Sequence, residues 1–252
     1  MKPFFAAIQF LTILPVPATL TGNGRALERS VPFFPVVGLL IGMVAAGFDL
    51  AISRLLPPLP ASACTVILLV ALSGGLHMDG LADTADGFFS ARPREKMLEI
   101  MRDSRTGVMG VIAVLAVLIL KITLLTAILP EWRWCLILLM PLAGRSAIVT
   151  LMTALPYVRQ EGGLATLFDK NRSWLSVLWT WGLMMVAGWW SAREIGLAIL
   201  LFSAVTAILF ALYSSRKIGG FTGDTLGAGC ELTEIAPLLV GAICHHAGLT
   251  IL

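Results

Sequence analysis

Three aspartates are the residues whose types and spacing most directly suggest chemistry. Asp79, Asp83 and Asp86 stand at positions i, i+4 and i+7 in the segment 77–87, HMDGLADTADG. On a helix this spacing places all three side chains on one face. Crowded carboxylates repel one another and resist leaving water, so they need a positive partner. Because Mg²⁺ prefers oxygen ligands and keeps positions open for phosphate oxygens, the pattern predicts a magnesium site at Asp79, Asp83 and Asp86.

Small residues separate these acids, since positions 80, 82, 85 and 87 are glycine or alanine. We expect them to leave room for a ligand close to the carboxylates. The alternative is an acidic stripe that is merely solvated at a membrane border. Such borders more often mix charges and rarely keep glycine beside the acids, so a ligand site is favoured.

A second polar stretch, RDSRTG at positions 102–107, ends an amphipathic segment that begins at Arg94. We expect the apolar side chains at 97–101 to lie on the membrane surface. Arginine guanidinium groups bind phosphate bidentately. Arg102, Arg105 and the intervening Ser104 are therefore predicted to contact a phosphorylated ligand, whereas the basic residues at 92–96 are explained equally well as membrane anchors.

Two single residues stand out because of their surroundings. Arg145 lies inside a long apolar run, where an arginine is costly unless it faces a polar cavity or a carboxylate. Binding a ligand phosphate and pairing with the aspartates would both satisfy it, and the sequence leaves both open. His77 directly precedes the aspartates and is a candidate acid, base or hydrogen-bond donor toward the substrate, with a structural role equally open.

The last polar stretch, 219–229, holds five glycines in eleven residues and is expected to be a loop. Glycine-rich backbone turns sharply and can present its N–H groups to an anion. We expect Thr222, Gly223 and Asp224 to bind ligand as a second half-site. Glu231 and Glu234, which follow, are expected on or near the cytoplasmic face of the membrane.

Composition shows what kind of molecule must position these residues. Of 252 residues, 58% are hydrophobic and only 13% are charged, whereas a soluble domain carries about 25% charged residues. The chain is therefore an integral membrane protein. A nucleic-acid binder, a secreted disulfide scaffold and a disordered chain are excluded, and the four cysteines show no metal-binding spacing.

Several apolar stretches approach the roughly 20 residues that a membrane-spanning helix needs. The fold is predicted to be all-α, a polytopic transmembrane helix bundle of about 6–8 spans. Residues 1–252 are expected to form one membrane-embedded domain, with the motif loops on the cytoplasmic face. The predicted spans are 33–52, 61–76, 107–129, 134–155, 174–190, 195–213 and 235–252.

The basic residues indicate how the bundle is oriented. Alternate connections hold 13 of the 18 lysines and arginines, and the opposite connections hold only Arg54, Arg133 and Arg193. Because short loops rich in Lys and Arg stay in the cytoplasm, the N-terminus is expected inside and the C-terminus outside. The 13 residues are Lys2, Arg25, Arg29, Arg92, Arg94, Lys96, Arg102, Arg105, Arg159, Lys170, Arg172, Arg216 and Lys217.

At these motifs the chain resembles cobalamin synthase, the adenosylcobinamide-GDP ribazoletransferase family. The resemblance is carried by HMDGLADTADG at 77–87, MRDSRTG at 101–107 and Gly223-Asp224. The first two motifs are specific and the third is less so. Length, hydropathy and motif order agree over nearly the whole chain.

The resemblance implies a bacterial inner-membrane enzyme that joins adenosylcobinamide-GDP to α-ribazole, or to its 5′-phosphate, and releases GMP. It implies Mg²⁺ as the cofactor and the acidic motif as its ligands. The partners are then the two substrates and the lipid bilayer, with no nucleic acid. A homo-oligomer and contacts with other enzymes of nucleotide-loop assembly stay open.

A mechanism follows as a hypothesis. The 5′-hydroxyl of ribazole attacks the phosphorus attached to the cobinamide, while Arg102, Arg105 and Arg145 offset charge on the phosphoryl oxygens. Either Asp86 or Asp103 accepts the hydroxyl proton.

Two rival functions would also place an acidic motif in a membrane protein. Another membrane phosphotransferase or prenyltransferase is the nearer rival, but the acidic motif lacks the first class's Asp-Gly-x-x-Ala-Arg core and the second class's two separated Asp-rich motifs. A cation transporter is the more distant rival, since transport sites tend to lie at the bilayer midplane.

Overall fold

Long apolar runs of this chain become helices because lipid offers no partner to backbone polar groups. In the computed structural model, which describes residues 1–22, 24–159 and 173–249, five helices are long and apolar enough to cross a membrane. They are α4 (Phe34–Ile52), α8 (Val108–Ala127), α9 (Pro130–Ala154), α11 (Trp174–Ile218) and α12 (Gly223–His246). The shorter elements are α1 (Lys2–Leu11), α2 (Ala18–Thr21), α3 (Gly24–Glu28), η1 (Val31–Phe33), α5 (Pro58–Leu72), α6 (Leu76–Phe88) and α7 (Arg94–Ile100).

The 45 residues of α11 make two passes. That length is about twice what one crossing needs, and the backbone breaks at Arg193, where φ is 48° and ψ is −126°. Gly188 and Gly196, on either side of the break, approach so closely that a side chain at Gly196 would collide with the backbone of Gly188. The two halves therefore fold back as a hairpin, in agreement with the two spans expected at 174–190 and 195–213.

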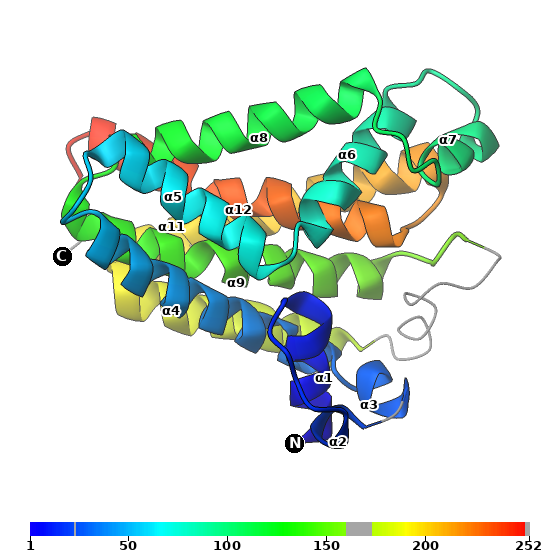
Figure 1. Ribbon diagram of the computed structural model, residues 1–252, viewed down its shortest axis with the longest axis horizontal. Coiled ribbons are helices and arrows are strands. Elements are labelled where there is room, and N and C mark those ends of the chain that lie inside the picture. Colours follow the sequence, from blue (N-terminus) through cyan, green and yellow to red (C-terminus); the bar gives the residue numbers. More distant parts are fainter. Residues whose placement is uncertain (23, 160–172, 250–252) are drawn as a thin grey trace.

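The second predicted span ends earlier than expected. Helix α5 stops at Leu72, and after a turn at Gly74 and Gly75, both with positive φ, α6 leaves at 89° to it. Only glycine adopts these two backbone conformations without steric cost. The bend moves the aspartate motif away from the direction of the spans and across the bundle (Figure 1).

The motifs gather at one end of the bundle. Helices α6 and α7 lie toward the end opposite the C-terminus (Figure 1). With α11 counted as two passes and the α5–α6 pair as one, the described chain makes seven passes, which confirms the predicted all-α membrane bundle. Of the basic residues that predicted the orientation, Lys170 and Arg172 lie outside the described residues.

Helix α9 forms the centre, and nearly all of its side chains are buried against α4, α11 and α12. Two glycines of α4 let it come close. A Cβ at Gly38 would lie 2.5 Å from the carbonyl oxygen of Pro141, and one at Gly42 would meet Leu138 as tightly. Small residues four apart are a common way for membrane helices to pack, since lipid tails provide no hydrophobic drive between helices.

We predict that Gly42→Ala destabilises the protein by about 1–3 kcal/mol, because the added methyl must push α4 away from α9. Gly47→Ala on the same helix is the matched control, since nothing lies within 4 Å of a Cβ there. The thermal unfolding midpoint in detergent measures both. Equal midpoints for the two variants would contradict the close α4–α9 contact.

Candidate active site

The acidic motif faces the start of α12 across a glycine contact. A Cβ at Gly80 would lie 2.7 Å from the carbonyl oxygen of Asp224, and one at Gly227 would lie 3.1 Å from the Cα of His77. The two helices therefore touch backbone to backbone. The small residues were expected to leave space for a ligand. That expectation was wrong at Gly80 and Gly87, because α12 occupies the space beside Gly80 and Met101 occupies the space beside Gly87.

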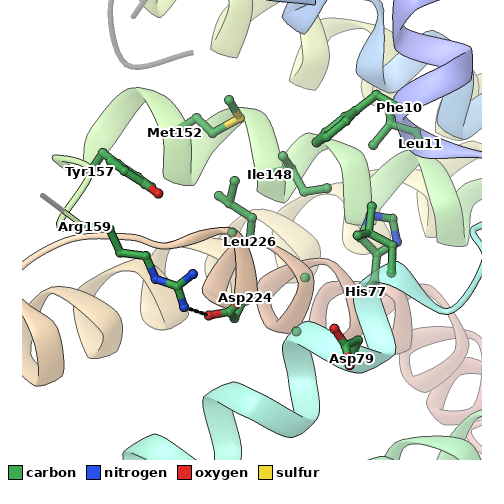
Figure 2. Close-up of a pocket in the computed structure, with 14 residues that line it drawn as sticks. Phe10, Leu11, His77, Asp79, Ile148, Met152, Tyr157, Arg159, Asp224 and Leu226 are labelled. Carbon is green, nitrogen blue, oxygen red and sulfur yellow. Dashed lines mark hydrogen bonds and ion pairs between the residues drawn. The ribbon is translucent and has the colours of Figure 1, made fainter. Parts of the chain in front are cut away.

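Beside this contact lies a cavity of about 210 Å³ between α1, α6, α9 and α12. Its polar lining comes from His77, Asp79, Tyr157, Arg159 and Asp224, and the rest of the wall is apolar side chains and glycine (Figure 2). Four of the predicted site residues meet here: His77, Asp79, Gly223 and Asp224.

Arg159 is a site residue whose place in the sequence indicated only a positive charge near the membrane. Its Nη2 lies 2.5 Å from Oδ2 of Asp224 (Figure 2) and also donates to the carbonyl oxygen of Met101 at 3.3 Å. The segment after α9 is held beside Asp224 by backbone pairing with Phe221. The N–H of Phe221 donates to the carbonyl oxygen of Pro156, and the carbonyl oxygen of Phe221 accepts from the N–H of Val158. No local pattern in the sequence predicts that pairing.

Tyr157 was also missed, and it lines the same cavity. Its ring packs edge-on against Phe221, with the centroids 5.5 Å apart. Burial raises the pKa of Tyr157, so its phenol keeps its proton at neutral pH and can act as a hydrogen-bond donor.

The glycine-rich stretch is mostly helix and not a loop, which corrects the prediction for 219–229. Thr222 caps α12: its hydroxyl accepts from the N–H of Thr225, and the Thr225 hydroxyl accepts from the N–H of Thr222. Thr222 also donates to Asp224 at 3.3 Å. Gly223, in the first turn, has nothing within 4 Å of a Cβ, so backbone there is open to a ligand.

The three aspartates share one face of α6, as predicted, but their side chains have different surroundings and partners. Asp79 lines the cavity. Asp83 is half-buried, with Asp79, Asp86 and Asp224 all acting on it electrostatically. Asp86 points toward α8, where its two oxygens accept the N–H groups of Gly107 at 2.6 Å and Gly110 at 2.8 Å.

Asp86 is thus an N-terminal cap for α8 supplied by another helix. The N–H groups at a helix start lack internal partners and carry a partial positive charge. A carboxylate there is well stabilised. With both oxygens engaged, Asp86 is poorly placed to act as the metal ligand or proton acceptor that its spacing suggested.

The donor atoms of the site suit a divalent cation, but the side chains do not lie close enough together to hold one by themselves. Within the residues that the structure describes, no group of three or more His, Cys, Asp or Glu side chains gathers closely enough to hold a metal ion. The donors are nevertheless all oxygens, and Arg159 is the positive group that the structure pairs with Asp224. Mg²⁺ commonly uses one or two carboxylates together with substrate phosphates, and Asp79 and Asp224 meet that description.

The loop at 101–107 lies beside this cavity and does not line it. Arg105 is almost fully exposed and forms an ion pair with Asp103 at 2.7 Å. Hydrogen bonds from Arg105 lower the pKa of Asp103 to about 2, so this carboxylate is a poor proton acceptor at neutral pH. Ser104 is exposed, and Arg102 lines a neighbouring hollow together with Arg159.

Helix α7 packs on protein, which corrects the expectation that its apolar side lies on the membrane surface. Met97 and Met101 are buried against Phe88 and Ile218. Arg94 Nε donates to the carbonyl oxygen of Ile218 at 2.7 Å. These contacts fix the start of the 101–107 loop.

Behind the cavity lies a buried cluster of charges on three helices. Lys121 of α8 donates to Glu231 and Glu234 of α12, at 2.6 Å each. Glu234 also pairs with Arg145 of α9. Glu231 and Glu234 were expected at the cytoplasmic face, and that was wrong: they lie inside the bundle, where their partners are cations of neighbouring helices.

Arg145 therefore satisfies its charge with a glutamate and not with the aspartate motif. Its Nη2 reaches Nδ1 of His77 at 3.5 Å. His77 lines the cavity, so Arg145 lies one side chain behind it. Direct contact of Arg145 with substrate stays a prediction.

Comparison with known proteins identifies the relatives of this chain. Residues 3–242 match the sequence model of a family described as cobalamin-5-phosphate synthase. An adenosylcobinamide-GDP ribazoletransferase of Desulforamulus reducens is 40% identical over 90% of this chain and 91% of its own. Proteins of the same name from Geotalea daltonii (34% identical; 95% of this chain, 96% of its own) and Pseudomonas paraeruginosa (40%; 96% and 98%) also match. No solved structure matches.

We predict that Asp86→Asn exposes the Gly107 or Gly110 amide to faster hydrogen exchange, because these N–H groups use one carboxylate oxygen each and an asparagine has an NH₂ donor in place of one of them. Loss of a cap costs about 1 kcal/mol. Deuterium uptake of the 101–110 peptide measures this, with Asp79→Asn as the control that leaves these amides protected. Unchanged uptake in Asp86→Asn would contradict the capping role.

We also predict that Glu234→Gln destabilises the protein by about 3–5 kcal/mol, since it leaves two buried cations short of a partner. Glu231→Gln should cost less, because within the described residues Glu231 pairs with Lys121 alone, whereas Glu234 pairs with both Lys121 and Arg145. Thermal unfolding in detergent compares them. A larger loss in Glu231→Gln would count against Glu234 as the centre of the cluster.

Proposed function

The chain belongs to the cobalamin-5-phosphate synthase family, and we propose that it joins adenosylcobinamide-GDP to α-ribazole, or to α-ribazole 5′-phosphate, with release of GMP. It is a multi-pass membrane transferase of the last step of cobalamin synthesis. The residues that would take part in the reaction lie around the cavity between α6 and α12.

The observation that carries the proposal is the meeting of opposite charges at that cavity. Asp79 of α6 and Asp224 of α12 face it, and Arg159 reaches the same place. A diphosphate needs cationic partners, and arginine binds phosphate oxygens in a fixed fork geometry. Gly223 lies in the first turn of α12, near the positive end of a helix, with open space where a side chain would stand.

The reaction is a displacement at phosphorus. The 5′-hydroxyl expected from the sequence is not free in α-ribazole 5′-phosphate, so the nucleophile common to both acceptors is another ribose hydroxyl. Its oxygen forms a bond to the phosphorus attached to the cobinamide, and the bond from that phosphorus to the bridging oxygen breaks. GMP leaves with the electron pair of that bond. Arg159, with Arg102 at the rim, would offset negative charge on the phosphoryl oxygens.

Asp83 is the carboxylate that we infer takes the hydroxyl proton. Of the two candidates proposed from the sequence, Asp86 is engaged with α8 and Asp103 is held by Arg105. Asp83 lies one helical turn from Asp79, and Asp224 of α12 is close enough to act on it electrostatically. General-base catalysis of this kind contributes about 10²–10⁴-fold to a rate.

Asp79 and Asp224 would hold Mg²⁺. When bound, the ion supplies positive charge to the diphosphate oxygens. Two carboxylates suffice if the substrate completes the coordination. The acidic pair would then serve the purpose predicted from the sequence for Asp79, Asp83 and Asp86, with Asp224 in place of Asp83 and Asp86.

The protein is proposed to lie in the inner membrane of a bacterial cell, with the site facing the cytoplasm. The support is the distribution of charge, with 13 of 18 basic residues in the connections of one side. Helices α6 and α7 lie toward the end of the bundle opposite the C-terminus (Figure 1), which is expected outside the cell.

GMP release tests the proposal directly. Membranes that contain the protein are given adenosylcobinamide-GDP and α-ribazole, with Mg²⁺ or with a chelator. GMP should form only with both substrates and the metal. A transporter would leave both substrates chemically unchanged, and that outcome would overturn the proposed reaction.

We predict that Asp83→Asn lowers kcat by about 10²–10⁴-fold and changes the KM values little, because a proton acceptor is lost and binding is kept. Glu131→Gln is the control: Glu131 is an exposed acid at the start of α9, at the opposite end of the bundle. Steady-state GMP release measures both variants. Wild-type kcat in Asp83→Asn would remove Asp83 from the mechanism.

A further inference from the structure

One polar side chain of the cavity is not used by the reaction described above. Tyr157 follows α9, and its half-buried side chain points its hydroxyl into the cavity, on the same side of Asp224 as Arg159 (Figure 2). Within the described part of the chain, that hydroxyl forms no hydrogen bond with another residue. A phenol is a hydrogen-bond donor, so a group that enters the cavity can be its partner.

The ring of Tyr157 is held in place by Phe221, so the hydroxyl has a fixed position. The two rings meet edge-on, with their centroids 5.5 Å apart. The backbone on both sides of Tyr157 is also bonded to Phe221, through Pro156 at 2.9 Å and Val158 at 3.1 Å. A donor that is already in place stabilises developing charge without reorganisation, and phosphoryl transfer depends on such positioned groups.

The direction of the displacement decides which part of the diphosphate lies at Tyr157. Asp83, the inferred proton acceptor, belongs to α6, so the ribose hydroxyl approaches the phosphorus from the α6 side. The attacking and leaving oxygens of a phosphoryl transfer lie roughly in line, on opposite sides of the phosphorus. Tyr157 and Arg159 lie on the other side of Asp224 from Asp79 of α6 (Figure 2). GMP therefore departs toward Tyr157.

The departing phosphate needs more stabilisation than Arg159 alone supplies. When the bridging oxygen leaves with the electron pair, the phosphate of GMP gains negative charge. Arg159 already donates to Asp224 at 2.5 Å and to the carbonyl oxygen of Met101 at 3.3 Å, so part of its donor capacity is occupied. A hydroxyl beside it is a second donor. Its hydrogen bond strengthens as the charge develops, because bonds to ionised acceptors are roughly twice as strong as neutral ones.

We propose, on the premise of the reaction assigned above, that the Tyr157 hydroxyl donates a hydrogen bond to a phosphate oxygen of the departing GMP. The bond from the phosphorus to the bridging oxygen breaks, that oxygen keeps the electron pair, and the phenol keeps its proton. Tyr157 is then a catalytic residue that contacts the leaving group, whereas Asp83 serves the nucleophile.

Tyr157→Phe removes the hydroxyl alone, since phenylalanine keeps the ring that packs on Phe221. Tyr213→Phe is the matched control. Tyr213 is the other of the two tyrosines, its ring meets Phe88 edge-on with the centroids also 5.5 Å apart, and it does not line the cavity. In steady-state GMP release, Tyr157→Phe should lower kcat about 10–100-fold, the effect of losing one hydrogen bond to a charged group. Tyr213→Phe should keep the wild-type kcat.

Equilibrium binding to the purified protein in detergent tests the contact without turnover. GMP and guanosine are the probes, each with Mg²⁺ present, because they differ only in the phosphate. Tyr157→Phe should weaken GMP binding about tenfold and change guanosine binding by less than about twofold. Tyr213→Phe should bind both probes as the wild type does.

Equal GMP affinity in the wild type and Tyr157→Phe, or an equal weakening of GMP and guanosine binding, would overturn the assignment, since a ring that serves packing alone cannot distinguish the two probes. Wild-type kcat in Tyr157→Phe would overturn it as well. Because the binding assay needs no turnover, the two failures are distinguished: wild-type membranes that release no GMP contradict the reaction, and unchanged GMP binding contradicts the Tyr157 contact.

Discussion

The buried charges of Lys121, Glu231, Glu234 and Arg145 are the constraint on which the rest of the bundle depends. Two cations and two carboxylates from α8, α9 and α12 meet where lipid and protein exclude water. Each charge alone would be expensive at that depth. Together they neutralise one another, so the three helices have one arrangement that satisfies all four. That arrangement fixes His77 beside the cavity.

The active site is then built by two helices that are separated in sequence and touch through glycine. Gly80 and Gly227 let α6 and α12 meet backbone to backbone, which brings Asp79 next to Asp224. The bend at Gly74 and Gly75 turns α6 across the bundle, and the pairing of Phe221 with the chain after α9 delivers Arg159. A cation or phosphate would be gripped between two rigid elements and not by one flexible loop.

Periodicity and charge predicted much of this, and longer-range contacts account for the rest. The spacing of Asp79, Asp83 and Asp86 correctly predicted one helical face, and apolar length predicted the spans. Spacing could not reveal that Asp86 serves α8, because its partners Gly107 and Gly110 lie more than twenty residues away. Arg159 was hidden among membrane-anchoring charges, and Glu231 and Glu234 followed a glycine-rich stretch that resembled a loop but begins a helix.

On the proposed mechanism, the diphosphate binds between α6 and α12 and not at the 101–107 loop. The most direct measurement is a cryo-electron microscopy map of the protein with Mn²⁺ and adenosylcobinamide-GDP, without ribazole. Density for the metal and diphosphate beside Asp79, Asp224 and Arg159 is the expected result. Density held by Arg105 and Ser104, with the α6–α12 cavity empty, would contradict the account.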